Sequence, residues 1–244
     1  MIYKGKKGQF TGGKAIGILT LESSPVAFIP GDVNNATSYG FPVRYQNVEG
    51  LTVQKAINRD PSIYPSLKQA AEQLVAQGVR AITGGCGFMG MHQPKLADEM
   101  DIPIFLSSLM QIPFITGLIG NKGKIGIVTA DSNCLAADLL EANGVFDTSN
   151  LIIEGLQEKP NFYSFGIEES GKLDSEAVKE ELIETAQFLV NSHQNIKALL
   201  LECSLLPPYS AAVQKSIGIP VFDYMTMINF VFSATVQKEY NGFL

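Results

Sequence analysis

The sequence predicts an α/β protein with two pseudo-symmetric α/β domains, parallel sheets and a ligand cleft between the domains. Apolar, strand-like runs alternate with helical patterns, which favours parallel strands joined by right-handed crossovers. The run that ends near Cys86 recurs as the run that ends near Cys203. Each cysteine is followed by an Ile-Pro pair whose proline lies 17 positions later (103 − 86 and 220 − 203). Such internal repetition indicates a duplicated unit.

The first strand recurs as well. Residues 14–20 (Lys-Ala-Ile-Gly-Ile-Leu-Thr) return as 124–129 (Lys-Ile-Gly-Ile-Val-Thr), with Ile16 matching Ile125 at an offset of 109 (125 − 16). The cysteines are offset by 117 (203 − 86), so the second half carries a net insertion of eight residues (117 − 109). We therefore expect a first domain of residues 1–115 plus 225–244 and a second domain of residues 116–224.

In the first half, a long stretch at 25–50 is rich in Gly, Pro, Asn and aromatic residues. Such a stretch is either a surface excursion or a functional lid or subunit contact. Apolar periodicity and the positions of Pro and Gly predict the other elements. These are a strand at 14–20, a helix at 65–77, a strand at 79–83, a short helix at 94–100, a strand at 103–106, and a helix at 111–119 that Pro113 and Gly117 are expected to break.

The second half repeats this alternation. Ser132 or Asn133 can cap a helix that runs to residue 143, and Pro207-Pro208 can open another, because proline is tolerated in a first turn. The expected elements are strands at 124–129, 151–154, 196–201 and 219–222, a polar loop after 154, and further helices at 174–193 and 225–240.

Composition narrows the function classes. The chain has 244 residues and a net charge of −6, which argues against nucleic-acid binding. No apolar run is long enough for a membrane helix, and residues 1–6 lack the apolar core of a secretory signal. Three cysteines suggest no disulfide framework, and no Cys/His group has zinc-ligand spacing. We expect a cytoplasmic protein without metal or cofactor that acts on a small molecule, with neither nucleic acid nor membrane as partner, and possible homo-oligomers.

The repeated cysteines carry the chemical prediction. Ligands of parallel sheets bind beyond the carboxyl ends of the strands, and both cysteines lie just past such ends. A helix N-terminus favours a thiolate, and each cysteine precedes an expected helix. If one thiol is ionised and the other protonated, one removes a proton while the other delivers one from the opposite face. That exchange inverts a carbon centre without a cofactor.

These residues resemble the aspartate/glutamate racemase superfamily, which includes hydantoin racemases, maleate isomerases and arylmalonate decarboxylases. The stretch Glu202-Cys203-Ser204-Leu205-Leu206-Pro207 is similar to the family's Gly-Cys-Thr-x-x-Pro. Cys86-Gly87-Phe88 replaces the family's Cys-Asn-Thr, and Leu205 stands where glutamate racemases have a histidine. The resemblance implies that Cys86 and Cys203 are the acid/base pair. The departures make glutamate an unexpected substrate.

The sequence thus predicts a cofactor-independent racemase or isomerase for a small carboxylate- or amide-bearing compound, amino-acid or hydantoin-like. Two alternatives stay open: a non-catalytic small-molecule binding protein of the same fold, and a decarboxylase that needs one cysteine. Turn or capping duty is the competing interpretation for several of the binding candidates. The candidates for substrate binding are Glu22, Ser23, Ser24, Gly87, Phe88, Ser132, Ser204, Leu205 and Tyr209.

Overall fold

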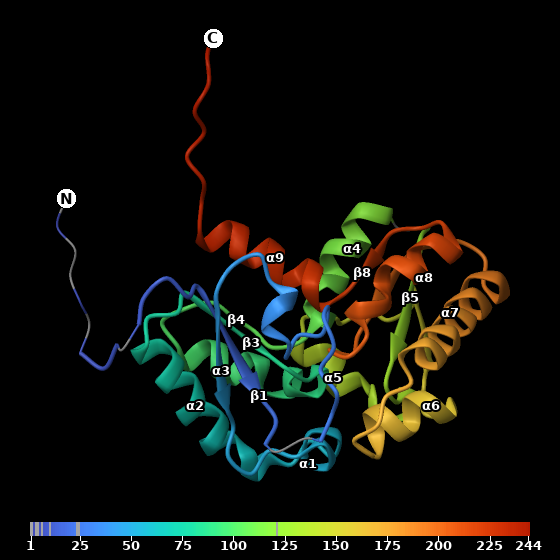
Figure 1. Ribbon diagram of the computed structural model, residues 1–244. Coiled ribbons are helices and arrows are strands. Elements are labelled where there is room, and N and C mark those ends of the chain that lie inside the picture. Colours follow the sequence, from blue (N-terminus) through green and yellow to red (C-terminus); the bar gives the residue numbers. More distant parts are fainter. Residues whose placement is uncertain (1, 3–4, 6, 10, 23–24, 121) are drawn as a thin grey trace.

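The computed structural model describes the 244-residue chain except residues 1, 3–4, 6, 10, 23–24 and 121. Two sheets of four parallel strands form the architecture, in the orders β2-β1-β3-β4 and β6-β5-β7-β8. Figure 1 shows them side by side, with the first sheet on the left and the second on the right. This confirms the predicted α/β class with two parallel sheets. Within the described residues, no helix combines the length and apolarity needed to cross a membrane.

The first half builds its sheet around β1, which pairs in parallel with β2 on one side and β3 on the other. Its apolar strands are buried because helices cover the sheet. The elements are β1 (Ile16–Thr20), β2 (Val43–Asn47), α1 (Val53–Ile57), α2 (Tyr64–Ala76), β3 (Ala81–Gly84), α3 (Gln93–Glu99), β4 (Ile104–Phe105) and α4 (Ile112–Ile119).

The second half repeats the arrangement around β5, which pairs with β6 and β7. Its elements are β5 (Lys124–Thr129), α5 (Ala137–Ala142), β6 (Leu151–Gly155), α6 (Pro160–Phe162), α7 (Ser175–Ser192), β7 (Ile196–Leu201), α8 (Ser210–Ile217), β8 (Val221–Phe222) and α9 (Tyr224–Thr235). The last helix returns to the first sheet, where Tyr224, Met227 and Ile228 share a buried cluster with Ile16 and Ile18. The exact domain boundaries stay a prediction.

The duplication extends to the packing of the crossover helices. Gly17 in β1 and Gly126 in β5 are offset by 109 (126 − 17), as the strands are. A Cβ at Gly17 would lie 2.8 Å from Leu74 Cδ1 on α2, and one at Gly126 would lie 2.8 Å from Leu189 Cδ2 on α7. Each central strand therefore uses a glycine so that a leucine of its covering helix can approach closely.

The stretch at 25–50 differs from the prediction because it contains the edge strand β2. Val43-Arg44-Tyr45-Gln46-Asn47 lacks the continuous apolar run of a central strand, since an edge strand needs less burial. The part before β2 crosses to the second domain. Gly31 packs against Pro208: a Cβ added to Gly31 would lie 2.7 Å from the Cα of Pro208. The backbone N–H of Val33 donates to Ser204 O at 3.5 Å.

Several helix bounds also differ. The helix at 112–119 is regular, because Pro113 stands in its first turn, where no intrahelical N–H is needed. Asp131, rather than Ser132 or Asn133, caps the turn after β5, and α5 begins only at Ala137. The last helix ends at Thr235, five residues before the predicted end at 240 (240 − 235).

Candidate active site

The repeated cysteines occupy corresponding places in the two halves. Cys86 follows β3 and leads into a 3-10 turn (Gly87–His92), while Cys203 follows β7 and precedes the turn at Pro207–Tyr209. Hydrogen bonds between the halves hold these loops together. Ser204 Oγ donates to Gly85 O at 2.8 Å, and Ser108 Oγ donates to Glu202 O at 3.0 Å. The carboxyl ends of the two sheets therefore meet at the thiols.

Both cysteines line one pocket between the halves. The first half contributes Leu21, Val26, Phe28, Asn34, Val53, Ile57, Gly85, Cys86 and Phe88, and the second contributes Ala130, Gly166, Ile167, Glu169, Cys203, Ser204 and Leu205. The cavity measures about 50 Å³, far below the roughly 300–1,000 Å³ of drug-sized ligand sites. It suits a small substrate. Among the described lining residues, Glu169 is the carboxylate, and none is Lys, Arg or His.

Burial dominates the electrostatics of both thiols. It raises the pKa of Cys86 to about 12, although the N–H groups of Phe88 and Met89 act in the opposite direction. The pKa of Cys203 is also raised, first by burial and then by the charge of Glu202, while the N–H of Leu205 opposes the rise. The expected lowering of the thiol pKa by helix N-termini is therefore wrong in direction. The N–H groups are present, but desolvation outweighs them.

A buried carboxyl lies where the two thiol loops meet. Glu202 is 1% exposed, and Thr129 Oγ1 donates to its Oε2 at 2.9 Å. Its Oε1 has no hydrogen-bond partner among the described residues and packs against Gly87, where a Cβ would lie 1.6 Å away. Burial raises the pKa of Glu202 to about 7. The motif contained this residue, yet no signal in the sequence indicated that its side chain reaches the other half.

The crossing loop before β2 supplies polar groups to the pocket side. Asp32 is 1% exposed and accepts the N–H of Asn34 at 2.6 Å. Burial raises the pKa of Asp32 to about 7, against the effect of that N–H. Asn34 lines the pocket, and its buried Oδ1 has no partner among the described residues. The sequence predicts that this loop is either a surface excursion or a functional lid or subunit contact, but it singles out neither Asp32 nor Asn34.

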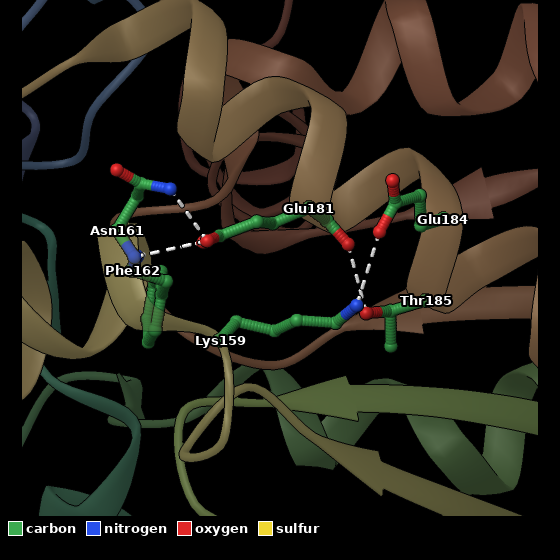
Figure 2. Close-up of polar contacts among 6 residues, drawn as sticks. All are labelled: Lys159, Asn161, Phe162, Glu181, Glu184 and Thr185. Atoms are coloured by element: carbon green, nitrogen blue, oxygen red, sulfur yellow. Dashed lines mark hydrogen bonds and ion pairs between the residues drawn. The ribbon is translucent and has the colours of Figure 1, made fainter.

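The opposite wall comes from the segment that begins at α6. Figure 2 shows how Glu181 on α7 hydrogen-bonds the start of this segment. The Glu181 carboxylate accepts the backbone N–H groups of Asn161 and Phe162, at 2.9 and 2.8 Å, and the side-chain amide of Asn161 at 2.7 Å. A π-helical turn (Tyr163–Ile167) follows. It leads to Glu169, whose φ of 54° is in the left-handed region. Carboxylate capping of free N–H groups thus positions one end of the wall.

The structure divides the sequence-predicted binding residues into three groups. Phe88, Ser204 and Leu205 line the thiol pocket with the two cysteines, and Gly87 lies directly behind it against Glu202. Ser23 and Ser24 lie outside the described residues. The remaining three are not in the lining of this pocket: Glu22 accepts the N–H of Gly50, Ser132 hydrogen-bonds Gln157, and Tyr209 accepts the hydroxyl of Ser175.

The sequence-based candidates include five of the sixteen described lining residues, Cys86, Phe88, Cys203, Ser204 and Leu205. Leu21, Val26, Phe28, Val53, Ile57, Ala130, Gly166, Ile167 and Glu169 come from loops and short helices with no motif of their own. Only their position after strands β1, β2 and β5, or in the polar loop after β6, could have indicated them. The site is assembled by tertiary packing of the two halves.

No protein-family model matches the chain. A dimethylsulfoniopropionate lyase from Durusdinium sp. clade D is 32% identical over 221 residues, which are 88% of this chain and 73% of that protein. The chain belongs to the dimethylsulfoniopropionate lyase family. Dimethylsulfoniopropionate lyase 7 of Emiliania huxleyi (strain CCMP1516) is also 32% identical, over 87% of this chain and 64% of its own length. For lyase 6 of the same strain the chain spans 57% of the relative's length.

Solved structures share the fold of this lyase-family chain at low identity. Picrophilus torridus aspartate racemase has a TM-score of 0.57 at 16% identity, over 94% of this chain and 96% of its own. Unliganded arylmalonate decarboxylase has a TM-score of 0.57 at 12% identity, over 93% and 94%. The allantoin racemase of Pseudomonas fluorescens has a TM-score of 0.53 at 14% identity, over 93% and 100%. The superfamily resemblance is thus confirmed for the fold.

The prediction of a racemase or isomerase is wrong, because the sequence relatives are named as lyases. The findings support an enzyme, but not an amino-acid racemase. The error has a physical source. Two thiols at equivalent strand ends do not fix the reaction, because a base that removes a proton beside a carboxylate serves elimination as well as racemisation.

Proposed function

We propose that this chain is a lyase that cleaves a small carboxylate bearing a sulfonium group, of the dimethylsulfoniopropionate class. A thiolate removes a proton from the carbon next to the carboxylate. The C–H electron pair forms a carbon–carbon double bond, and the C–S bond breaks so that a neutral dialkyl sulfide leaves with its electron pair. The products are the sulfide, an unsaturated carboxylate and a proton, first held by the thiol. The sequence relatives support the substrate class.

The pocket's charge pattern is the observation that carries this proposal. A sulfonium is a cation, and the described lining offers one carboxylate, Glu169, together with the rings of Phe28 and Phe88. Aromatic faces and carboxylates both attract cations. A dicarboxylate such as aspartate or a malonate would need basic partners, and Lys, Arg and His are missing from the described lining. The small cavity also suits a compound of few atoms.

Neutral groups remain for the substrate carboxylate. Asn34 lines the pocket, and its Nδ2 donates to Gly85 O at 3.5 Å. An amide NH₂ has two N–H donors, so the second can hydrogen-bond a carboxylate. The thiol that does not act as base can, when protonated, donate a hydrogen bond where negative charge develops. Two thiols on one pocket would then act as base and hydrogen-bond donor within a single elimination.

The test is product analysis with the purified protein and dimethylsulfoniopropionate. We expect dimethyl sulfide in the headspace and the unsaturated acid in solution in equal amounts, with one proton released per turnover. The Cys86→Ser and Cys203→Ser variants serve as controls for catalysis by buffer or contaminants. Absence of sulfide from a folded protein, or sulfide release from both cysteine variants at the wild-type rate, would overturn the proposal.

A further inference from the structure

The buried Glu202 has a geometry that a packing role does not require. Its carboxyl is anchored on one side by the Thr129 hydroxyl, and its other oxygen is left without a partner among the described residues, against the Gly87 backbone. A buried carboxyl oxygen without a hydrogen bond lowers the stability of the folded protein. Its presence therefore calls for a functional explanation. Glu202 directly precedes Cys203 in the sequence, and Gly87, the residue that it contacts, directly follows Cys86. Both thiols also interact electrostatically with it.

The charge balance of the pocket explains what such a carboxyl can do. If a thiol here loses its proton to solvent, a new negative charge must be buried, which burial strongly opposes. If the proton passes instead to a carboxylate that is already buried, the total charge of the pocket is unchanged. Only the difference in free energy between a buried thiolate and a buried carboxylate then has to be overcome.

We propose that Glu202 is a positioning residue that accepts the proton of a pocket thiol, so that one negative charge is shared between the carboxyl and the two thiols. The thiol and the carboxylate become a thiolate and a carboxylic acid. The thiolate then takes the substrate proton as the sulfide leaves, and becomes a thiol again. Glu202 finally releases its proton to solvent, which returns the carboxylate and accounts for the proton that the elimination sets free. The elimination step rests on the proposed function, whereas the sharing of charge does not.

The groups that face this carboxyl are consistent with a single shared charge. Thr129 is a neutral donor to it. Tyr224 on α9 interacts electrostatically with Glu202 and both cysteines, and burial raises the pKa of its phenol, which donates to Leu106 O at 2.8 Å. Tyr224 therefore stays protonated. The titrating groups of the cluster are then Glu202, Cys86 and Cys203. Two further carboxyls act on the thiols, Asp32 on Cys203 and Glu169 on Cys86, and a negative charge on any of these groups opposes ionisation of the thiols.

The experiment measures iodoacetamide alkylation of each pocket thiol against pH, without substrate. Cys134→Ser removes the third thiol, and Cys86→Ser or Cys203→Ser leaves one pocket thiol to follow. Because burial raises the pKa of Glu202 to about 7, the rate should rise steeply with pH up to that region and then level off, since the charge already in the pocket opposes a second ionisation. With Glu202→Gln, the thiol must titrate by itself, and the rate should rise about tenfold per pH unit through the whole range.

A second variant keeps the proposal falsifiable if Glu202→Gln fails to fold. Thr129→Val removes the hydrogen bond that favours the carboxylate, so the inflection should persist but move to higher pH. Asp32, whose pKa burial also raises to about 7 and whose charge acts on Cys203, is replaced by Asn in every variant of this series. An inflection near pH 7 that then survives Glu202→Gln, or one that Thr129→Val leaves in place, would overturn the shared charge. Because no substrate is used, that failure would leave the lyase proposal standing, and a protein without lyase activity could still show the shared charge.

Discussion

At the scale of single residues, the site places two thiols in an environment that suppresses their ionisation. Desolvation raises the pKa of both thiols, against the backbone N–H groups at the turns that follow them. The same desolvation strengthens every electrostatic interaction in the pocket, because effective dielectric falls with burial. A base whose conjugate acid has a high pKa also takes a proton more completely once it is ionised. The suppressed thiols are therefore strong bases when the charge reaches them.

Removing either thiol tests whether they act as base and donor. Cys86→Ser and Cys203→Ser keep the side-chain shape, but a hydroxyl ionises far less readily than a thiol. We expect the variant that has lost the base to lose about 10²–10⁴-fold in kcat, the usual contribution of general base catalysis. Sulfide release under saturating substrate gives the measurement. Cys134→Ser, which lies outside the pocket lining, is the matched control and should retain activity.

Glu169 should govern recognition of the cation. Replacing it by Gln keeps the size and removes the charge, so KM for dimethylsulfoniopropionate should rise about tenfold, equivalent to about 1.4 kcal/mol. Competitive inhibition separates charge from shape. N,N-dimethyl-β-alanine carries a positively charged nitrogen. 4-Methylpentanoate has the same shape, with an uncharged carbon in place of that nitrogen. The inhibition constant of the wild type should be lower for the first compound than for the second, and Glu169→Gln should reduce the ratio of the second constant to the first. An unchanged preference would contradict this role.

At the scale of elements, the sequence predicts the central strands well because they are buried on both faces and read as continuous apolar runs. β7 matches its predicted bounds of 196–201, and β5 matches 124–129. The edge strand β2 was missed because its residues are half exposed and mixed in polarity. The turn at α6 was missed because its capping group, Glu181, comes from another helix.

Gly87 of the first half packs directly against Glu202 of the second. In Gly87→Ala, the new Cβ would lie 1.6 Å from Glu202 Oε1, whose residue is 1% exposed. The backbone or the carboxyl must shift, and we expect a loss of about 1–3 kcal/mol in unfolding free energy. Urea denaturation measures it. Gly117→Ala is the control, because no atom lies within 4 Å of its added Cβ and alanine favours a helix; it should leave the stability unchanged or higher.

The anchoring of α6 can be tested in the same way. Glu181→Ala leaves the N–H groups of Asn161 and Phe162 without their acceptor, so the free energy of unfolding should fall by about 1–2 kcal/mol. Amide hydrogen exchange should rise over residues 160–171. The matched control is Glu184→Ala on the same helix, which removes the exposed ion pair with Lys159 that Figure 2 also shows and should change stability by less than about 1 kcal/mol. Equal exchange in both variants would argue against the anchor.

At the scale of the whole molecule, the sequence shows that the chain is duplicated but not what the duplicated halves do to each other. The repeat placed Cys86 and Cys203 at equivalent strand ends, and the structure brings both to one pocket. The chemistry was predicted wrongly, because in the proposed function the substrate class depends on groups such as Glu169 and Asn34. These groups reach the pocket from irregular segments, whose path is set by packing against the opposite half.

Burying carboxyls at the junction of the two halves should make the stability of the molecule depend on pH in an unusual direction. Burial raises the pKa of Asp32 from 3.8, and that of Glu202 from 4.5, to about 7 in each case. Between about pH 4 and 7 the folded state therefore binds more protons than the unfolded chain. Their contribution to stability is fully present below the unfolded pKa values and is lost as the pH rises to 7.

Denaturation at pH 5, 6 and 7 measures this dependence. Each carboxyl can lower the unfolding free energy by at most about 1.4 kcal/mol per pH unit, and the double variant Asp32→Asn, Glu202→Gln should flatten the slope. Exposed carboxyls whose pKa is lowered by hydrogen bonds, such as Asp60 and Asp147, have the opposite effect. They act below their ordinary pKa values. In the range from pH 5 to 7, Asp223, whose pKa burial raises, acts in the same direction as the buried pair, and His92, whose pKa burial lowers from 6.5, acts in the opposite direction. A slope that the double variant leaves unchanged would show that Asp32 and Glu202 are ionised at the junction without penalty.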